Sequence, residues 1–232
     1  MNSDFEKILI IAAHPDDEIL GCGGLLNKFA KKDVPIRIVF LAEGISSRFS
    51  NIDSNHEKIK REIEVRERCS INAIKKLGIN PNQVFFSKRK CCQLDQYPRL
   101  ELTKEIEMHI KNFSPTCLIT HFEKDTNIDH RICYEAMLPA IRPEKNLNLK
   151  LVLSFEILSS TEWNYPYQFK PNFFVDITDD LEEKLNACRE YTYEIKEKDS
   201  ARSIESLKHL AFIRGNQSGY KYAEGFQLIV KR

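Results

Sequence analysis

A run of apolar residues near the start of the chain, followed at once by charged ones, constrains the fold more than any other feature. Residues 8–13 are all apolar, which is typical of a buried parallel strand with both faces covered. Residues 14–18 then read His-Pro-Asp-Asp-Glu, and a glycine-rich segment follows at 21–24. The glycines predict a tight turn into a helix that packs close to the sheet.

Residues 14–18, called the acidic bend below, contain one imidazole and three carboxylates within five positions. This concentration of charge is costly unless a cation or a substrate balances it. Because His14 and Asp17 are three residues apart, both side chains can face one point at the carboxyl end of the strand, where they suit zinc. Asp16 is then a candidate general base. Alternatively, the carboxylates only interact favourably with a helix dipole. The buried strand and the histidine favour the metal site.

Two motifs resemble those of a known family. His-Pro-Asp-Asp-Glu after a strand, with Gly-Cys-Gly-Gly behind it, resembles the signature of the PIG-L/LmbE-like zinc-dependent N-acetylglucosamine de-N-acetylases. Residues 125–131, Asp-Thr-Asn-Ile-Asp-His-Arg, resemble the second metal motif of that family, and residues 153–163 resemble a bacterial subgroup. The presence of both motifs, in this order, argues against a coincidental match.

The resemblance implies a divalent metal ion, Zn²⁺ or another such as Fe²⁺, held by His14, Asp17 and His130. It also implies that Asp16 acts as the general base toward a metal-activated water. Asp129 would orient a neighbouring group.

The second motif departs from the commonest family pattern, because Asn127 stands where a second histidine is usual. That histidine is thought to stabilise the developing oxyanion or to protonate the leaving amine, and an amide does only the first. Three solutions remain open: Asp16 returns the proton, His121 replaces the missing acid, or Asn127 serves as an oxyanion donor alone. We favour Asp16 with Asn127 assisting, because the bacterial subgroup also has asparagine there.

Four residues are candidates for substrate binding. Arg66 matches a family arginine that helps to hold the substrate, although an arginine in mid-helix is ordinarily exposed. Arg48 lies in a loop at the sheet edge where α/β proteins bind ligands, and a polar surface loop is the alternative. Trp163 belongs to an aromatic segment suited to a sugar ring, or equally to the core or a subunit contact. His121 follows a buried run and reaches the same edge as the acidic bend.

Strands alternating with helices predict an α/β, Rossmann-like fold with a mostly parallel sheet and flanking helices. A chain of 232 residues, 42% hydrophobic and 30% charged, fits one domain spanning residues 1–232. Near the C-terminus we expect a helix from Asp179 to about Lys198, a last helix over 203–213, and an antiparallel edge strand at 226–230.

Composition narrows the class of function. A net charge of +1 gives no global field that would attract nucleic acid or an anionic membrane. No apolar stretch approaches the roughly 20 residues that span a bilayer, and the first strand begins too early for a signal peptide, so we expect a cytoplasmic location. The seven cysteines lack CxxC spacing and fit neither a disulfide framework nor a thiolate zinc site. A dinucleotide-binding turn is also excluded, because Leu26 occupies the position of the third glycine.

The resemblance, together with the predicted metal site, implies a metal-dependent hydrolase that removes an acetyl group from the nitrogen of an amino sugar or its conjugate. The partner would be a small N-acetylated molecule, and a homo-oligomer is compatible with the sequence. Two alternatives remain: a zinc amidase acting on a non-sugar or thiol-conjugate amide, and a sugar-binding or regulatory module with weak turnover. Asn127 is the main argument for the second alternative.

Overall fold

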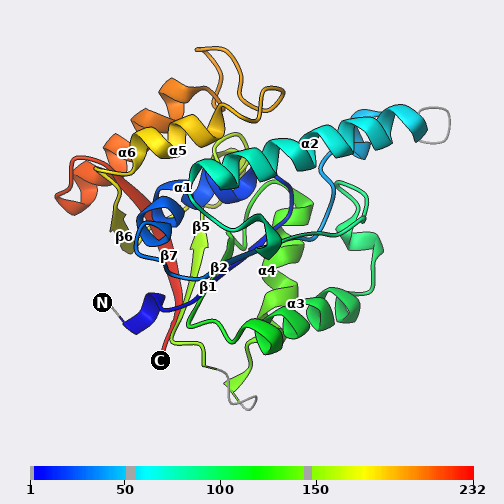
Figure 1. Ribbon diagram of the computed structural model, residues 1–232, viewed down its shortest axis with the longest axis horizontal. Coiled ribbons are helices and arrows are strands. Elements are labelled where there is room, and N and C mark those ends of the chain that lie inside the picture. The colour runs from blue at the N-terminus through cyan, green and yellow to red at the C-terminus, as the bar shows by residue number, and fades with distance from the viewer. Residues whose placement is uncertain (1–2, 51–55, 144–147) are drawn as a thin grey trace.

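The computed structural model describes residues 3–50, 56–143 and 148–232, and a seven-stranded sheet runs through its centre (Figure 1). The strands are β1 (Ile8–Ala12), β2 (Ile36–Phe40), β3 (Val84–Phe86), β4 (Cys117–His121), β5 (Leu151–Phe155), β6 (Phe173–Asp176) and β7 (Ala223–Lys231). Their order across the sheet is β3-β2-β1-β4-β5-β7-β6. Neighbouring strands are parallel from β3 to β5, and β7 is antiparallel to both β5 and β6.

The predicted α/β class with a mostly parallel sheet is therefore confirmed. The last strand is antiparallel as expected, but its predicted edge position is wrong, because β6 pairs with its outer side. The sequence pattern did not reveal β6, which is only four residues long and lies at the end of the aromatic segment.

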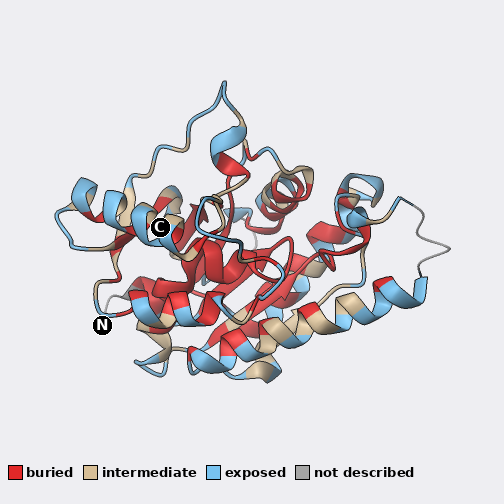
Figure 2. Cartoon of the chain, turned by 90° about the horizontal axis from the view of Figure 1, so that it is seen from above, coloured by how far each residue is buried: buried red, intermediate tan, exposed pale blue. Residues whose placement is uncertain are grey.

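Helices cover both faces of the sheet (Figure 1). They are α1 (Asp17–Ala30), α2 (His56–Lys76), α3 (Arg99–Phe113), α4 (Ile128–Ala140), α5 (Leu181–Cys188) and α6 (Ile204–Ser218). Alternate residues of β1 enter two hydrophobic clusters: Ile8 and Ile10 pack with residues of α1, α5 and α6, whereas Leu9 and Ile11 pack with residues of α3 and α4. Figure 2 shows the resulting buried interior with exposed residues around it. Burial on both faces explains why β1 is apolar throughout.

Helix α1 begins earlier than predicted. The glycines expected to form a tight turn lie inside the helix, which is interrupted at Cys22 by non-helical backbone angles. Glu224 accepts hydrogen bonds from the free N–H groups of Gly24 and Leu25, at 2.8 and 2.7 Å. The predicted close packing is present, because a Cβ atom at Gly21 would collide with the ring of Phe155. Glycine is thus needed here for the approach of helix to sheet.

The predicted long helix from Asp179 to Lys198 is wrong in its second half, because α5 ends at Cys188 and residues 189–203 form turns. Tyr191 and Glu194 are drawn from this segment into the interior, where they contact groups near the first motif. These tertiary contacts stabilise the turns of residues 189–203 in place of a continued helix. In the described part of the chain, none of the helices has the length and apolar character needed to cross a membrane.

Candidate metal centre

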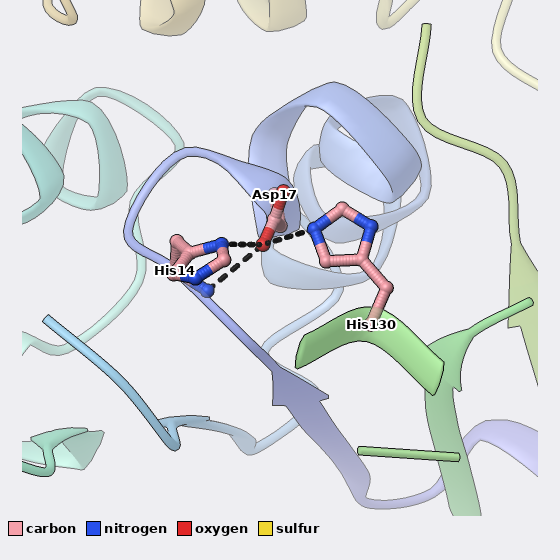
Figure 3. A group of neighbouring side chains, drawn as sticks. All are labelled: His14, Asp17 and His130. Atoms are coloured by element: carbon pink, nitrogen blue, oxygen red, sulfur yellow. Dashed lines mark hydrogen bonds and ion pairs between the residues drawn. The ribbon is translucent and has the colours of Figure 1, made fainter. Parts of the chain in front are cut away.

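The three predicted metal ligands converge at the carboxyl end of the parallel strands. His14 follows β1, Asp17 is the first residue of α1, and His130 lies in the first turn of α4. Oδ2 of Asp17 lies 3.5 Å from both His14 Nδ1 and His130 Nε2, and Figure 3 shows the two rings turned toward that oxygen. The backbone N–H of His14 also donates to Oδ2 of Asp17 at 2.8 Å, which fixes the bend. The strand-bend-helix pattern of the sequence therefore builds the predicted constellation.

Each of the two imidazoles has a carboxylate next to the ring nitrogen that faces away from Asp17. The Nε2 atom of His14 hydrogen-bonds Asp129 Oδ2 at 2.9 Å, and His130 Nδ1 lies 3.2 Å from Asp125 Oδ1. Thr161 donates to Asp125 at 2.5 Å. These partners leave His14 Nδ1 and His130 Nε2 directed at the common point, as carboxylates behind metal-ligating histidines do.

The donor set fits a divalent ion. The three donor atoms lie within 4.8 Å of one another, and all three residues are buried. Within the described residues, neither Asp17 Oδ1 nor His130 Nε2 makes a hydrogen bond. Buried polar atoms without partners are costly, and a metal ion between the two rings would satisfy Nε2 of His130. Two imidazoles and one carboxylate suit zinc, and they also match the ligand type of non-haem Fe(II) sites.

The charge balance supports this interpretation. Although burial opposes it, hydrogen bonds to Asp129 and Asp17 raise the pKa of His14 to about 10. Burial likewise disfavours a charged His130, but Asp17 and Asp125 raise its pKa to about 9. The pKa of Asp17 lies well below its ordinary value, because the neighbouring imidazoles outweigh the effect of burial. Without an ion, protons on the two rings thus balance the buried carboxylates.

Asp16, the predicted general base, is buried beside the ligands in a rarely populated backbone conformation with φ 137°. Its oxygens pair with two guanidinium groups: Oδ1 with Arg66 at 3.0 Å and Oδ2 with Arg202 at 2.9 Å. Burial raises the pKa of Asp16 to about 6, although the two arginines act in the opposite direction. A carboxyl group with a pKa near neutrality is suited to accept a proton and return it.

Glu18 fixes the backbone at Asp16. Its Oε2 accepts a hydrogen bond from the Asp16 N–H at 2.9 Å, and its Oε1 accepts one from the hydroxyl of Tyr191. Burial raises the pKa of Glu18 to about 8, while the bond from Tyr191 acts in the opposite direction. Since φ 137° is strained for any residue with a side chain, this contact helps to hold Asp16 in place.

Arg66 does not take the exposed position that is ordinary for an arginine in mid-helix. It is buried, and besides Asp16 it donates to the carbonyl of Pro15 at 2.7 Å and to Glu194 at 2.5 Å. Arg202 bridges Asp16 and the hydroxyl of Ser159. No sequence motif indicated a role for Arg202 or Glu194, because both lie in irregular segments whose positions depend on the tertiary fold.

The side chains of His121 and Asn127 make structural contacts with neighbouring protein groups. His121 Nε2 accepts a hydrogen bond from the Ala13 N–H at 2.8 Å, and its ring stacks on His130 at a centroid distance of 3.9 Å. Burial and the neighbouring His130 lower the pKa of His121 well below its ordinary value, so the ring is neutral and lacks the proton of an acid. Asn127 is the N-cap of α4, where its side-chain oxygen accepts from the Asp129 N–H at 2.9 Å. Only the amide nitrogen of Asn127 thus remains for a donor role.

The remaining two predicted substrate contacts lie outside the buried centre. Arg48 pairs with Glu194 at 2.5 Å and lines a cavity of 180 Å³ that also borders Arg66 and Tyr193. Trp163 is 51% exposed, and its segment is attached to the centre through Thr161. Neither residue contacts the three ligands directly.

Comparison with known proteins gives a consistent picture. The sequence profile of the PIG-L family, described as GlcNAc-PI de-N-acetylase, matches residues 9–141. A diacetylchitobiose deacetylase of Thermococcus kodakarensis is 28% identical over 98% of this chain and 84% of its own length. A probable N-acetyl-alpha-D-glucosaminyl L-malate deacetylase 2 of Bacillus subtilis is 26% identical over 79% of this chain and 81% of its own.

Solved structures confirm the fold. The N,N'-diacetylchitobiose deacetylase of Pyrococcus horikoshii is similar with a TM-score of 0.73 and 22% identity, over 97% of this chain and 84% of that one. A 4-carboxy-2-hydroxymuconate hydratase of Pseudomonas putida is also similar, with a TM-score of 0.69 and 21% identity over 97% of both chains. The fold alone therefore does not decide the reaction. The family profile covers more than half of the chain and includes both metal motifs, and the chain belongs to the PIG-L family.

Proposed function

We propose that this protein is a metal-dependent hydrolase that removes the acetyl group from the nitrogen of an amino sugar or its conjugate. The observation that carries the proposal is the convergence of His14, Asp17 and His130 beside the buried carboxyl of Asp16. The curated relatives in the family are deacetylases, which supports the same reaction type.

His14, Asp17 and His130 would hold the ion, which supplies polarisation of the amide carbonyl and a lowered pKa of water. Asp16 takes a proton from the attacking water, whose oxygen forms the new bond to the carbonyl carbon. The carbon–nitrogen bond then breaks, and Asp16 returns the proton to the leaving amine. The products are acetate and a free amine.

Two further residues are assigned supporting roles: Asn127 stabilises developing charge, and Asp129 positions a metal-binding ring. The amide nitrogen of Asn127 donates to the developing oxyanion. Asp129 holds the ring of His14 through Nε2, which leaves Nδ1 as the nitrogen that would bind the ion. The neutral state of His121 supports Asp16, rather than His121, as the acid that replaces the missing family histidine.

Substrate contacts are assigned by position. Arg48 faces the cavity beside Arg66 and would contact sugar hydroxyls, and Trp163 would stack on a ring of the substrate. Arg66 acts by holding Asp16 and the loop around Pro15, and His121 acts by supporting the bend at Ala13. Both are positioning residues in this assignment.

The resident ion is proposed to be Zn²⁺, with Fe²⁺ as the alternative that elemental analysis would distinguish. All seven cysteines are free, which supports a reducing, cytoplasmic location. The exposed aromatic residues around Trp163 leave room for a homo-oligomer, which sedimentation would test.

A panel of N-acetyl compounds with detection of released amine tests the function. It should include N-acetylglucosamine, N,N'-diacetylchitobiose, an N-acetylglucosaminyl conjugate of a small acid, and a thiol-conjugate amide. We expect hydrolysis of at least one amino sugar, and a fall of at least about 100-fold in Asp16→Asn with the metal content retained. Asp95→Asn, at an exposed position, is the matched control.

Two outcomes would redirect the proposal. Turnover confined to the thiol-conjugate amide would indicate the alternative amidase. Tight binding of a sugar to metal-loaded protein without acetate release would indicate a binding or regulatory module, and full activity of Asp16→Asn would remove Asp16 from the mechanism.

A further inference from the structure

A second donor set lies on the side of His14 that faces away from Asp17. It consists of His14 Nε2, Cys91 Sγ and a carboxylate oxygen of Asp129, all buried and within 4.8 Å of one another. The sulfur lies 3.4 Å from Nε2 of His14, and Oδ2 of Asp129 lies 2.9 Å from the same nitrogen. The three residues come from the bend after β1, the segment after β3 and the first turn of α4.

The spacing of this second donor set is compatible with metal ligation after a small outward movement of the carboxylate. Zinc bonds of about 2.0 Å to nitrogen and oxygen and about 2.3 Å to sulfur place ligands at tetrahedral angles roughly 3.3 to 3.6 Å apart. The distance of 3.4 Å from His14 Nε2 to the sulfur lies in this range, whereas the hydrogen-bonded carboxylate oxygen at 2.9 Å would have to move slightly outward to make room for an ion. A nitrogen, a sulfur and an oxygen donor together suit zinc and other thiophilic divalent ions.

The backbone also holds the second donor set in position. Asp129 accepts hydrogen bonds from the N–H groups of Cys92 and Leu94, at 2.6 and 3.0 Å. The N–H of Cys91 donates to Glu43 at 2.9 Å. The segment after β3 therefore wraps around Asp129 and fixes the sulfur beside the imidazole before any ion binds, which reduces the cost of ordering a site.

We propose that His14, Cys91 and Asp129 form a second divalent metal site, distinct from the centre made by His14, Asp17 and His130. An entering ion displaces two protons to solvent, one from the thiol of Cys91 and one from Nε2 of His14. The imidazole then bridges both sites, with Nδ1 toward the first and Nε2 toward the second.

A metal ion bound in the second site lowers the affinity of the first site for its own ion. The hydrogen bond from His14 Nε2 to Asp129, which orients Nδ1, is lost when the second ion takes both groups. The two ions therefore bind with negative coupling, so that one equivalent binds tightly and the second weakly. An excess of metal inhibits the enzyme, and this last consequence rests on the proposed deacetylase function.

Titration of the metal-free protein with Co²⁺ in degassed buffer tests the binding. We expect a tight first equivalent without thiolate-to-cobalt absorption in the near ultraviolet, and a weaker second equivalent that produces it. In Cys91→Ser the absorption disappears and the second equivalent weakens at least about tenfold, while the first equivalent remains and shows that the variant is folded. Cys92→Ser is the matched control, since Cys92 is exposed and adjacent, and it should behave like the unchanged protein.

The proposal is overturned if the protein saturates at one equivalent, or if the absorption persists in Cys91→Ser. It is equally overturned if Cys92→Ser removes the absorption. A separate measurement follows hydrolysis while Zn²⁺ is increased beyond one equivalent, with each variant normalised to its own rate at one equivalent. We expect Cys91→Ser to need at least about tenfold more Zn²⁺ for the same inhibition.

The two proposals fail in different ways. Lack of hydrolysis of every substrate would reject the proposed function and leave the Co²⁺ titration intact. Hydrolysis whose sensitivity to excess Zn²⁺ is the same in the unchanged protein and in Cys91→Ser would reject the second site and leave the function intact.

Discussion

The metal-ligating side and the base-holding side of the centre are built from different parts of the chain. The proposed ligands His14 and Asp17 lie in one bend, and His130 lies at the start of one helix, so two short motifs bring them together. Asp16 instead depends on Arg66 from α2 and on Arg202 from the irregular segment before α6. Local geometry thus positions the proposed ligands, whereas long-range ion pairs position Asp16, the proposed base.

The largest expected effect is on the ligand side. Asp17→Asn removes the charge that both imidazoles face, so metal affinity should fall by more than about 100-fold, because loss of an outer partner alone costs about 10- to 100-fold. Metal content after dialysis and amide hydrolysis should be lost together. Retention of a full equivalent of metal in this variant would show that Asp17 is not a metal ligand.

A second prediction concerns the base side. Arg202→Met removes one of the two guanidinium partners of Asp16 and should lower kcat by roughly 10- to 100-fold through loss of position. The metal content should stay at the level of the unchanged protein, and Arg202→Lys should recover part of the rate. If Arg202→Met lost its metal as Asp17→Asn does, the division between the two sides would be wrong.

These two sides also differ in how far the sequence reveals them. Residues 8–18 place a strand, a bend and a helix start in order, so the fold class and the pairing of His14 with Asp17 follow from local patterns, whereas His130 was assigned as a ligand through the family resemblance of its motif. Arg202 and Glu194 have no such pattern, because they reach the site only through the tertiary fold. The prediction missed the end of α5 at Cys188 for the same reason, because the contacts of Tyr191 override a sequence that favours helix.

The positions of buried side chains were the least predictable part. Arg66 was expected to contact substrate, but it makes four polar contacts with protein groups whose positions a sequence does not reveal. These groups are the carbonyls of Pro15 and Gly44 and the carboxylates of Asp16 and Glu194. The contact of Cys91 with His14 was equally hidden, since the segment after β3 carries no motif.

A third prediction addresses the support of the strained backbone. Tyr191→Phe removes a buried hydroxyl that donates to Glu18, and the carboxylate then loses a partner. The free energy of unfolding should fall by about 1–3 kcal/mol, measured by urea denaturation. The metal content should be unchanged, and a smaller loss than in Tyr193→Phe, an exposed neighbour, would contradict the assignment.

A fourth prediction concerns the pH dependence of metal binding. The pKa values of His14 and His130 are raised to about 10 and about 9 in the metal-free protein, so both rings carry protons at neutral pH. An ion must displace these protons, and its affinity should therefore rise with pH, about tenfold per pH unit for each proton displaced, until the pH passes these pKa values. Calorimetry in two buffers of different ionisation enthalpy measures the protons released. Binding without proton release would contradict the charge balance of the centre.

Anomalous diffraction from crystals of the Asp16→Asn protein with one equivalent of Zn²⁺ tests the central claim most directly. We predict one ion about 2.0–2.2 Å from His14 Nδ1, a carboxylate oxygen of Asp17 and His130 Nε2. An ion bound elsewhere, or one that leaves any of these three residues without a bond to it, would contradict the account.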